Sequence, residues 1–395
     1  MSLKKAIVHI GNVKTGTTAI QAVLRVLRPE LALAGVLMPG LKPVEPAHYA
    51  IAKEWKLPKA RTLRSALIFE DIAAAGADKT ILMTAETLIN VPAAKLKEKL
   101  VAAGCGSFKI ILYVRPHISL LGSFYLQNLK MGIIRGPIGE HLGMLRGGAM
   151  QFLRVAEDYG QAFGRGNVIV REFHRSVLND GSVVTDFSAM PDLPASLLQK
   201  AEQSEQIANP TPTAEIALIL RACSNWLYNT APPRVRLENE AAPDGTGSFR
   251  VTTAALFQAL MAHKSDLPVT RFNLPVYLQQ ALNDRFRDER QAFAARWFAQ
   301  KPSAFWVDEK IEAPQPLLDL PALTVKTALK DALVRLRKTE KSKVPQALMS
   351  FREALPIVGS APNRKVATGS LAATFSLADD VPPKDAALKR LLTPQ

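Results

Sequence analysis

The sequence predicts an α/β fold with a central parallel sheet that is flanked by helices. In the first half of its 395 residues, short apolar runs alternate with helical patterns. Near-continuous apolar strands are typical of parallel sheets, because helices bury both faces of such a sheet. From about residue 194 onward the pattern becomes mostly helical. The fold class therefore rests on the apolar runs, on the helices between them and on this later helical region.

Four apolar runs are the candidate strands of the sheet. They lie at residues 6–10, 80–84, 109–114 and 167–170. Each run is short and nearly continuous, and helical patterns separate it from the next one. We therefore expect at least four strands that run in the same direction.

Helical periodicity fills the intervals between the runs. Residues 17–28 form the first predicted helix, and its apolar face consists of Ile20, Val23, Leu24 and Leu27. A second helix is predicted at residues 93–103 and ends at Gly104. The clearest helices of the second half are predicted at residues 214–226 and 276–300, and a loop rich in Asn, Pro and Gly is predicted at residues 239–248.

The chain is expected to form one large domain and an extension. Residues 1–310 are the predicted domain, with a core at 4–190 and a mostly helical part at 191–310. Residues 311–395 are rich in proline and alanine, and we expect them to be partly helical and partly disordered. Within them, the segment 326–343 carries seven basic and two acidic residues. This segment has no aromatic residues for base stacking, so we expect a solvated amphipathic helix and no binding of nucleic acid.

Composition and charge restrict the class of protein. Hydrophobic residues make up 48% of the chain and charged residues 22%, as in globular proteins. The net charge of +15 favours anionic partners, such as nucleic acid, a membrane surface, a nucleotide or an acidic polymer. No apolar stretch approaches the ~18 residues of a transmembrane helix. The run at residues 6–10 is also too short for the core of a signal peptide, so we expect a cytoplasmic protein.

Cysteines and histidines give no sign of a disulfide framework or a metal site. The chain has two cysteines, Cys105 and Cys223, and neither lies in a spacing typical of metal ligands. The six histidines form no i, i+4 pair. We therefore expect no bound metal.

The strongest local pattern is a loop rich in glycine and threonine between the first strand and the first helix. Its residues are Gly11, Asn12, Val13, Lys14, Thr15, Gly16, Thr17 and Thr18. The N-terminus of a helix offers unpaired N–H groups and the positive end of the helix dipole, so a loop at this position is suited to bind phosphate. In the Walker A loop of ATP-binding proteins the lysine follows the second glycine, whereas Lys14 precedes Gly16 by two residues.

The order strand, Gly-x-x-Lys-Thr-Gly-Thr-Thr, helix resembles the 5′-phosphosulfate loop of sulfotransferases that use 3′-phosphoadenosine 5′-phosphosulfate (PAPS). The resemblance implies a P-loop-NTPase-like three-layer α/β fold, here with a helical C-terminal extension. It also implies that PAPS is the co-substrate, that 3′-phosphoadenosine 5′-phosphate (PAP) is the product and that no magnesium is required. Cofactor binding is then expected from Gly11, Lys14, Thr15, Gly16, Thr17 and Thr18, with Lys14 also catalytic.

A second motif supports the same family. Its members hold the 3′-phosphate with an Arg at the end of a strand and a Ser eight residues later. Arg115 follows the strand at 109–114, and Ser123 stands at this separation. Residues 127–132 and 167–173 also resemble family segments, as does the pair Asp186 and Phe187, so the likeness spans about residues 4–186.

The general base is the part of the site that the sequence leaves open. Transfer to a hydroxyl requires a His, Glu or Asp within reach of the acceptor. His48 lies in a segment that resembles a His-containing helix start of bacterial members. Glu86 follows the strand at 80–84, at a position that resembles their Ser-Ser-Glu turn. Glu45 is a third candidate, and Arg250 is a candidate for a late basic contact to the 3′-phosphate.

Three functions remain in competition. The first is a sulfotransferase acting on a hydroxyl or amine, and the resemblance implies a carbohydrate or glycoconjugate as acceptor. The second is a P-loop kinase or NTPase, against which the position of Lys14 argues. The third is a binding protein that has kept the fold but lost catalysis. The sequence leaves the acceptor and the oligomeric state open.

Overall fold

The computed structural model describes most of the chain as two compact units. The first unit comprises Met1–Leu120, Leu145–Asn209 and Asn283–Lys310, and the second comprises Leu121–Met144, Pro210–Leu282 and Ile311–Gln395. The described residues are 3–42, 45–56, 64–134, 136, 138–139, 150–194, 211–230, 248–267, 270–304, 306–314, 327–332 and 334. The range 1–310, expected from the sequence to form one domain, is thus shared between the two units.

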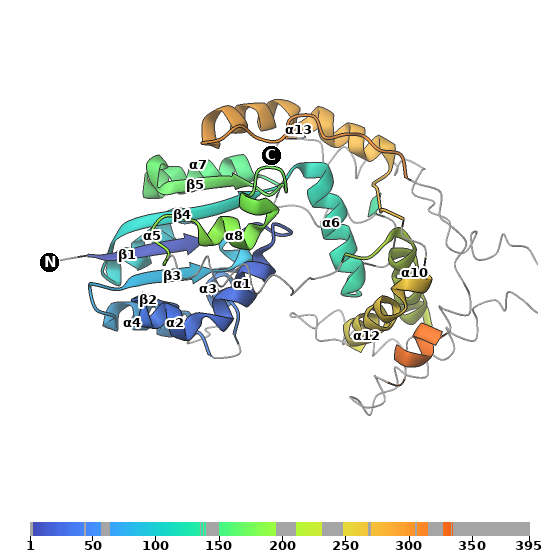
Figure 1. The fold of residues 1–395 in the computed structure, drawn as a ribbon, viewed down its shortest axis with the longest axis horizontal. Helices are drawn as coiled ribbons and strands as arrows, with labels where there is room; N and C mark the ends of the chain where they lie inside the picture. Colours follow the sequence, from blue (N-terminus) through green and yellow to red (C-terminus); the bar gives the residue numbers. More distant parts are fainter. Residues whose placement is uncertain are drawn as a thin grey trace, which may run out of the picture. The chain divides into compact units, whose positions relative to one another are not determined.

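A five-stranded parallel sheet forms the centre of the first unit (Figure 1). Its strands are β1 (Lys4–His9), β2 (Val36–Leu37), β3 (Thr80–Thr84), β4 (Cys105–Val114) and β5 (Val168–Glu172). The strand order is β2-β3-β1-β4-β5, and all four pairs of neighbours are parallel. The four predicted strands are therefore confirmed. The strand β2 was not predicted, since two residues are too short to give a pattern.

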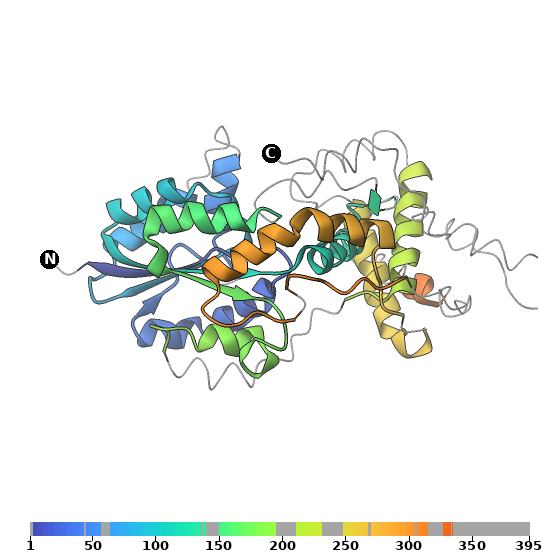
Figure 2. The ribbon, with the colours of Figure 1, turned by 90° about the horizontal axis from the view of Figure 1, so that it is seen from above.

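Helices cover both faces of this sheet, as Figures 1 and 2 show. Along β1 and the residue that follows it, the side chains alternate between two apolar cores. Ala6, Val8 and Ile10 enter one core, and Ile7 enters the other. The first core includes residues of α3 (Tyr49–Lys56), α4 (Arg64–Ala74), α5 (Ala93–Ala102), α7 (Phe152–Phe163) and the end of α13 (Val276–Trp297). The second core includes residues of α1 (Thr17–Val26), α2 (Arg28–Leu33) and α8 (Val183–Ser188). The arrangement fits a three-layer α/β fold.

The strand order determines where a ligand is expected. The connection after β1 leads towards β2 at one side of the sheet, whereas the connection after β4 leads towards β5 at the other. The loops after these neighbouring strands therefore diverge. In open α/β sheets, ligands bind outside the carboxyl ends of strands at such a switch point. The loop at residues 11–18 follows β1 and Arg115 follows β4, so both predicted motifs lie at this edge.

The second unit is helical in its described part. It contains most of α6 (His117–Lys130), then α10 (Ala214–Thr230) and α12 (Ser248–Ala262). The helices α10 and α12 pack against each other. The predicted helices at 214–226 and 276–300 are confirmed as α10 and α13. Most of the predicted loop at 239–248 lies outside the described residues, and Ser248 already begins α12.

Little of the predicted C-terminal extension is described. Residues 327–332 are helical, which agrees with the amphipathic helix predicted at 326–343, and residues 335–395 lie outside the described residues. In the described part of the chain, no helix combines the length and the apolarity that spanning a bilayer would take.

Candidate functional site

The loop between β1 and α1 has an unusual backbone conformation. Gly11, Lys14 and Gly16 have φ angles of 54°, 61° and 75°, in the left-handed region. Glycine adopts this region without a steric penalty, but a residue with a Cβ atom pays for it. Gly16 is also the residue that precedes the first turn of α1. The two glycines of the motif thus stand where the chain turns sharply into the helix.

Close packing requires the same two glycines. A Cβ atom on Gly11 would lie 2.8 Å from the Cα atom of Glu86, and one on Gly16 would lie 2.6 Å from Cγ1 of Val183. Both contacts are closer than side chains tolerate. The loop is therefore held between the start of η1 (Glu86–Asn90) and the start of α8, which brings Glu86 next to it.

Two threonines of the loop stabilise it internally. The hydroxyl groups of Thr15 and Thr17 donate to the carbonyl oxygen of Asn12, over 2.7 and 3.3 Å. The Asn12 side chain accepts from the N–H of Val13. Thr15 is fully buried, whereas Lys14 is half-buried and Thr18 is exposed. Buried hydroxyls thus fix the loop conformation, and Lys14 and Thr18 are its accessible polar side chains.

The N-terminus of α1 has features of an anion site. Its first turn contains no acidic residue, and no side chain caps it at Gly16. The helix dipole is therefore not compensated by a carboxylate of that turn. A bound phosphate or sulfate group would supply the missing negative charge and accept hydrogen bonds from the first N–H groups.

Arg115 joins the two sequence motifs. It follows the last residue of β4, and its Nη1 atom donates to the carbonyl oxygen of Lys14 over 3.2 Å. Its Nε atom donates to the hydroxyl of Ser119, also over 3.2 Å. The guanidinium carbon lies 5.7 Å from the centre of the Phe173 ring. Residues about one hundred positions apart in the sequence thus meet at the carboxyl ends of β1 and β4.

The two predicted 3′-phosphate ligands fall in different units. Arg115 belongs to the first unit, and Ser123 lies on α6 in the second. Within the first unit, the serine that contacts Arg115 is Ser119, four residues after it. The sequence analysis did not single out Ser119, although its position in the first turn after Pro116 could have suggested a contact. Arg250 lies on α12 in the second unit, and its side chain is outside the described residues.

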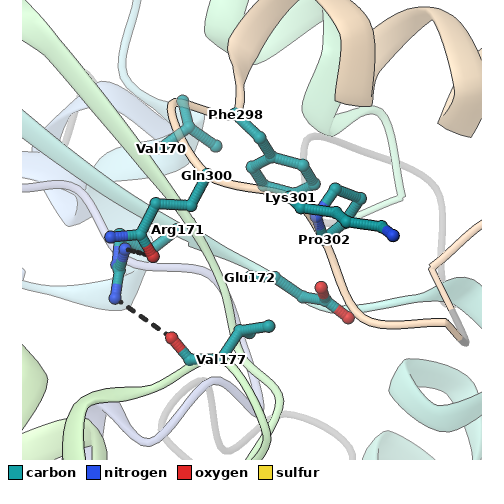
Figure 3. Close-up of a pocket in the computed structure, with 8 residues that line it drawn as sticks. All are labelled: Val170, Arg171, Glu172, Val177, Phe298, Gln300, Lys301 and Pro302. Atoms are coloured by element: carbon teal, nitrogen blue, oxygen red, sulfur yellow. Dashed lines mark hydrogen bonds between the residues drawn. The ribbon is translucent and has the colours of Figure 1, made fainter.

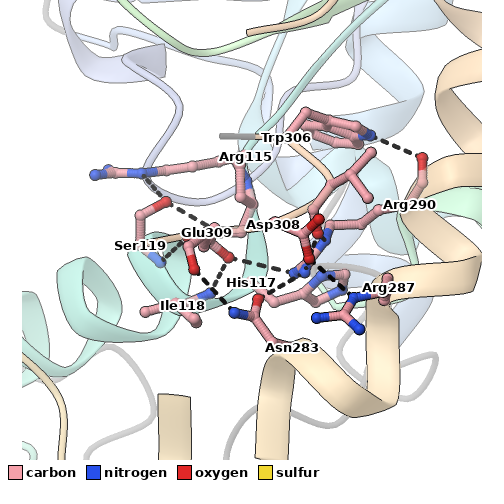
Figure 4. Close-up of polar contacts among 12 residues, drawn as sticks. Arg115, His117, Ile118, Ser119, Asn283, Arg287, Arg290, Trp306, Asp308 and Glu309 are labelled. Carbon is pink, nitrogen blue, oxygen red and sulfur yellow. Dashed lines mark hydrogen bonds and ion pairs between the residues drawn. The ribbon is translucent and has the colours of Figure 1, made fainter. Parts of the chain in front are cut away.

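A buried carboxylate caps the start of α6 (Figure 4). The two oxygens of Glu309 accept from the backbone N–H groups of Ile118 and Ser119, over 2.7 and 2.8 Å. Arg290, whose side chain is fully buried, forms an ion pair with Glu309 at 3.3 Å and donates to Asn283 at 2.7 Å. This network orients the helix turn that carries Ser119, the partner of Arg115. No local pattern pointed to Glu309, since 190 residues separate it from Ser119.

His48 occupies a structural position. Its side chain is fully buried, and both ring nitrogens are engaged by the backbone. Nδ1 accepts from the N–H of Thr84 over 3.1 Å, and Nε2 donates to the carbonyl oxygen of Pro39 over 3.1 Å. Burial lowers the pKa of His48 to about 4, although the two backbone contacts oppose this shift. A ring with no available nitrogen is a poor acceptor for a substrate proton, which argues against His48 as the base.

Glu86 is placed better for proton transfer. It is half-buried at the start of η1, and its Oε2 atom contacts the hydroxyl of Tyr49 at 3.1 Å and Nε2 of Gln21 at 3.4 Å. No hydrogen bond from the described residues reaches the other oxygen, Oε1. Glu86 thus has one restrained oxygen and one that a substrate could approach, beside Gly11 of the loop.

Glu45, the third candidate, serves a turn. Its carboxylate accepts from the backbone N–H of Lys42 at 3.1 Å and pairs with Arg64, and its carbonyl oxygen accepts from Arg28. These contacts connect it to the segment that leads into α3. The geometry therefore favours Glu86 over both Glu45 and His48.

A second polar network supports the loop indirectly, through α8. Asp186, fully buried on α8, pairs with Arg171 of β5 and accepts from the hydroxyl of Tyr113 over 2.7 Å. These contacts hold α8, whose Val183 packs against Gly16. Figure 3 shows the residues that line a pocket beside this network: Val170, Arg171, Glu172, Val177, Phe298, Gln300, Lys301 and Pro302. Arg171 donates to Gln300 there, and Ser303 donates to Glu172, so Arg171 and Glu172 serve the fold.

Neither metal ligands nor relatives identify the site further. In the ranges that the structure describes, no three His, Cys, Asp or Glu side chains gather as ligands for a metal ion. No protein-family model matches the chain, and neither a curated protein nor a solved structure is significantly similar to it. The site is therefore interpreted from its own geometry and from the resemblance of its motifs.

Proposed function

We propose that this protein is a sulfotransferase that moves a sulfuryl group from PAPS to an acceptor hydroxyl or amine. The observation that carries the proposal is the hydrogen bond between Arg115 and the carbonyl oxygen of Lys14. It joins the two motifs that resemble the cofactor site of this family, at the sheet edge where open α/β folds bind ligands. The proposal includes a P-loop-like identity for the fold and a cytoplasmic location.

Each motif has a role in this proposal. The N–H groups at the start of α1 and the Lys14 ammonium bind the 5′-phosphosulfate, with Gly11, Thr15, Gly16, Thr17 and Thr18 shaping the loop. Arg115 binds the 3′-phosphate through its planar guanidinium, which is suited to phosphate oxygens. Ser123 is assigned the second contact to that phosphate by the resemblance alone.

The transfer itself is an in-line displacement at sulfur. The acceptor oxygen or nitrogen forms a bond to sulfur while the bond from sulfur to the 5′-phosphate oxygen breaks. The leaving group is PAP, and Lys14 stabilises the charge that develops on its phosphate oxygen. The acceptor proton passes to Oε1 of Glu86. The acceptor is proposed to be a carbohydrate or glycoconjugate, on the family resemblance.

Calorimetric titration with PAP tests the proposal, with parallel titrations of ATP in the presence and absence of magnesium. PAP is expected to bind without magnesium. Arg115→Ala should weaken this binding by roughly 10- to 100-fold, because a charge-assisted hydrogen bond contributes about 1.5–3 kcal/mol. Arg154→Ala is the matched control, since Arg154 is exposed on α7 and belongs to neither motif.

Three results would contradict the proposal in different ways. Preferential binding of magnesium-ATP would favour a kinase or NTPase. Absence of any nucleotide binding would mean that the loop at 11–18 has been misinterpreted. Binding of PAP with no transfer from PAPS to any hydroxyl or amine of an acceptor panel would favour a binding protein that has lost catalysis.

A further inference from the structure

Three side chains form a closed ring of polar contacts beside the loop. Gln21 projects from α1, Tyr49 from the start of α3, and Glu86 from the start of η1. The Tyr49 hydroxyl lies 3.1 Å from Oε1 of Gln21 and 3.1 Å from Oε2 of Glu86. Nε2 of Gln21 lies 3.4 Å from the same oxygen of Glu86. Each of the three side chains thus contacts both of the others.

The Tyr49 hydroxyl has two acceptors but only one hydrogen to donate. When Glu86 is ionised, its charged Oε2 is the stronger acceptor, and the hydrogen points to it. When Oε1 of Glu86 carries a proton, Oε2 becomes a neutral carbonyl oxygen. The hydroxyl can then rotate and donate to Oε1 of Gln21, while Nε2 of Gln21 continues to donate to Glu86. Oε2 of Glu86 therefore has a hydrogen-bond donor in both charge states, from Tyr49 and Gln21 when it is ionised and from Gln21 alone when it is protonated.

We propose that Tyr49 and Gln21 are positioning residues that hold the Glu86 carboxylate in place through the gain and loss of a proton. The inference rests on the proposed function, in which Glu86 is the base, and it deepens that function. The acceptor proton arrives on Oε1, the hydrogen of the Tyr49 hydroxyl changes partner, and no proton passes between Tyr49 and Glu86. The carboxylate keeps its orientation because Gln21 restrains Oε2 in both states.

Among the titratable groups near Glu86, Tyr49 is the one that donates a hydrogen bond to its carboxylate. Burial, followed by the charge of Glu86, raises the pKa of Tyr49, so its phenol remains a donor at neutral pH. His48, which precedes it, is kept neutral by burial. The loop beside Glu86 also carries the positively charged side chain of Lys14. On α7, Tyr159 donates to the backbone oxygen of Leu88 in η1 and not to the carboxylate.

Carboxyl NMR of the full-length protein, labelled with 13C at the side-chain carboxyl of glutamate, tests the inference. The Glu86 signal is assigned by its loss in Glu86→Gln. In Tyr49→Phe the pKa of Glu86 is expected to rise by about one unit, because the ionised form loses a charge-assisted hydrogen bond. Gln21→Met should shift it in the same direction. Both shifts are measured without an acceptor, so the test does not require its identity.

Tyr159→Phe is the matched control. It removes a tyrosine hydroxyl that contacts η1 but leaves the carboxylate contacts intact, so the Glu86 titration should not change. If the Glu86 titration is unchanged in Tyr49→Phe while PAP binding is intact, the inference is overturned alone. If the unmodified protein fails to bind PAP, the proposed function is overturned, whatever the titration shows.

Discussion

At the scale of single residues, Lys14 combines a charge with a costly backbone conformation. Its φ of 61° lies in the left-handed region, which costs a residue with a Cβ atom roughly 1–2 kcal/mol relative to glycine. In this conformation the carbonyl oxygen of Lys14 accepts a hydrogen bond from Arg115, and the Lys14 side chain lies at the edge of the loop. The two contributions of Lys14, charge and conformation, can be separated by mutation.

Lys14→Ala and Lys14→Gly are both expected to reduce turnover by about 10²- to 10³-fold, since each removes the charge that stabilises the leaving group. Their stabilities should differ. Lys14→Gly relieves the strain, so its free energy of unfolding should exceed that of Lys14→Ala by about 1 kcal/mol. Turnover assays and chemical denaturation measure the two effects. Retained turnover in Lys14→Ala would contradict the mechanism.

His48 and Glu86 are expected to separate folding from catalysis. His48→Ala removes partners from the N–H of Thr84 and the carbonyl oxygen of Pro39, so stability should fall by about 3 kcal/mol. The folded fraction should retain turnover. Glu86→Gln should fold normally and lose turnover by about 10²- to 10⁴-fold. The opposite result, in which His48→Ala folds well but is inactive, would restore His48 as the base.

At the scale of elements, the start of α6 depends on a partner from the last sequence segment of the first unit, residues Asn283–Lys310. Glu309 provides the cap, and the fully buried Arg290 provides the counter-charge. A buried ion pair contributes little net stability when it is intact, but removing one partner leaves an uncompensated charge. Glu309 thus fixes the helix turn that carries Ser119, and Ser119 in turn accepts a hydrogen bond from Arg115.

Glu309→Gln is therefore expected to reduce the free energy of unfolding by about 3–5 kcal/mol. The neighbouring Asp308→Asn is the control, because Asp308 pairs with Arg287 at 2.9 Å in an exposed position. Exposed pairs contribute about 0–1 kcal/mol, so this control should be nearly neutral. Chemical denaturation followed by circular dichroism measures the stability of both variants. Equal losses of stability would contradict the idea that Glu309 compensates the buried charge of Arg290.

Local patterns explain which elements the sequence could predict. The loop at 11–18 and the strands β1, β3, β4 and β5 were predictable because each is encoded within a few consecutive residues. The cap at Glu309 was not, because its partners are 190 residues away. The sequence does not separate His48 from Glu86, because burial cannot be inferred from a segment that contains a single histidine. The hydrogen bond between Arg115 and Lys14 could not be predicted, because it depends on β1 and β4 being neighbours in the sheet, and no local pattern encodes the strand order.

At the scale of the whole molecule, three buried histidines in the first unit make its stability sensitive to acid. Burial lowers the pKa of His9 to about 3, of His48 to about 4 and of His117 to about 3. The unfolded chain protonates these rings near pH 6.5, whereas the folded chain keeps them neutral. Protons therefore bind preferentially to the unfolded state as the pH falls below 6.5, and they favour unfolding.

The free energy of unfolding is expected to be constant above about pH 7 for these groups and to fall from pH 6.5 to about pH 4 for His48 and to about pH 3 for His9 and His117. At pH 5 each histidine should account for a loss of about 2 kcal/mol, since one pKa unit corresponds to about 1.4 kcal/mol. Urea denaturation at a series of pH values measures the slope. A histidine variant that still folds should show a shallower slope, and an equal stability at pH 7 and pH 5 would contradict the prediction.

The hydrogen bond from Arg115 to the Lys14 carbonyl has a mechanical consequence for a nucleotide bound at both motifs. The residue that would hold one end of the ligand also restrains the backbone at the other end. A shift of the guanidinium would therefore act on the loop through this hydrogen bond. Such a site would favour a nucleotide that is long enough to contact both motifs. A shorter nucleotide that contacts only one motif would leave the other without a ligand.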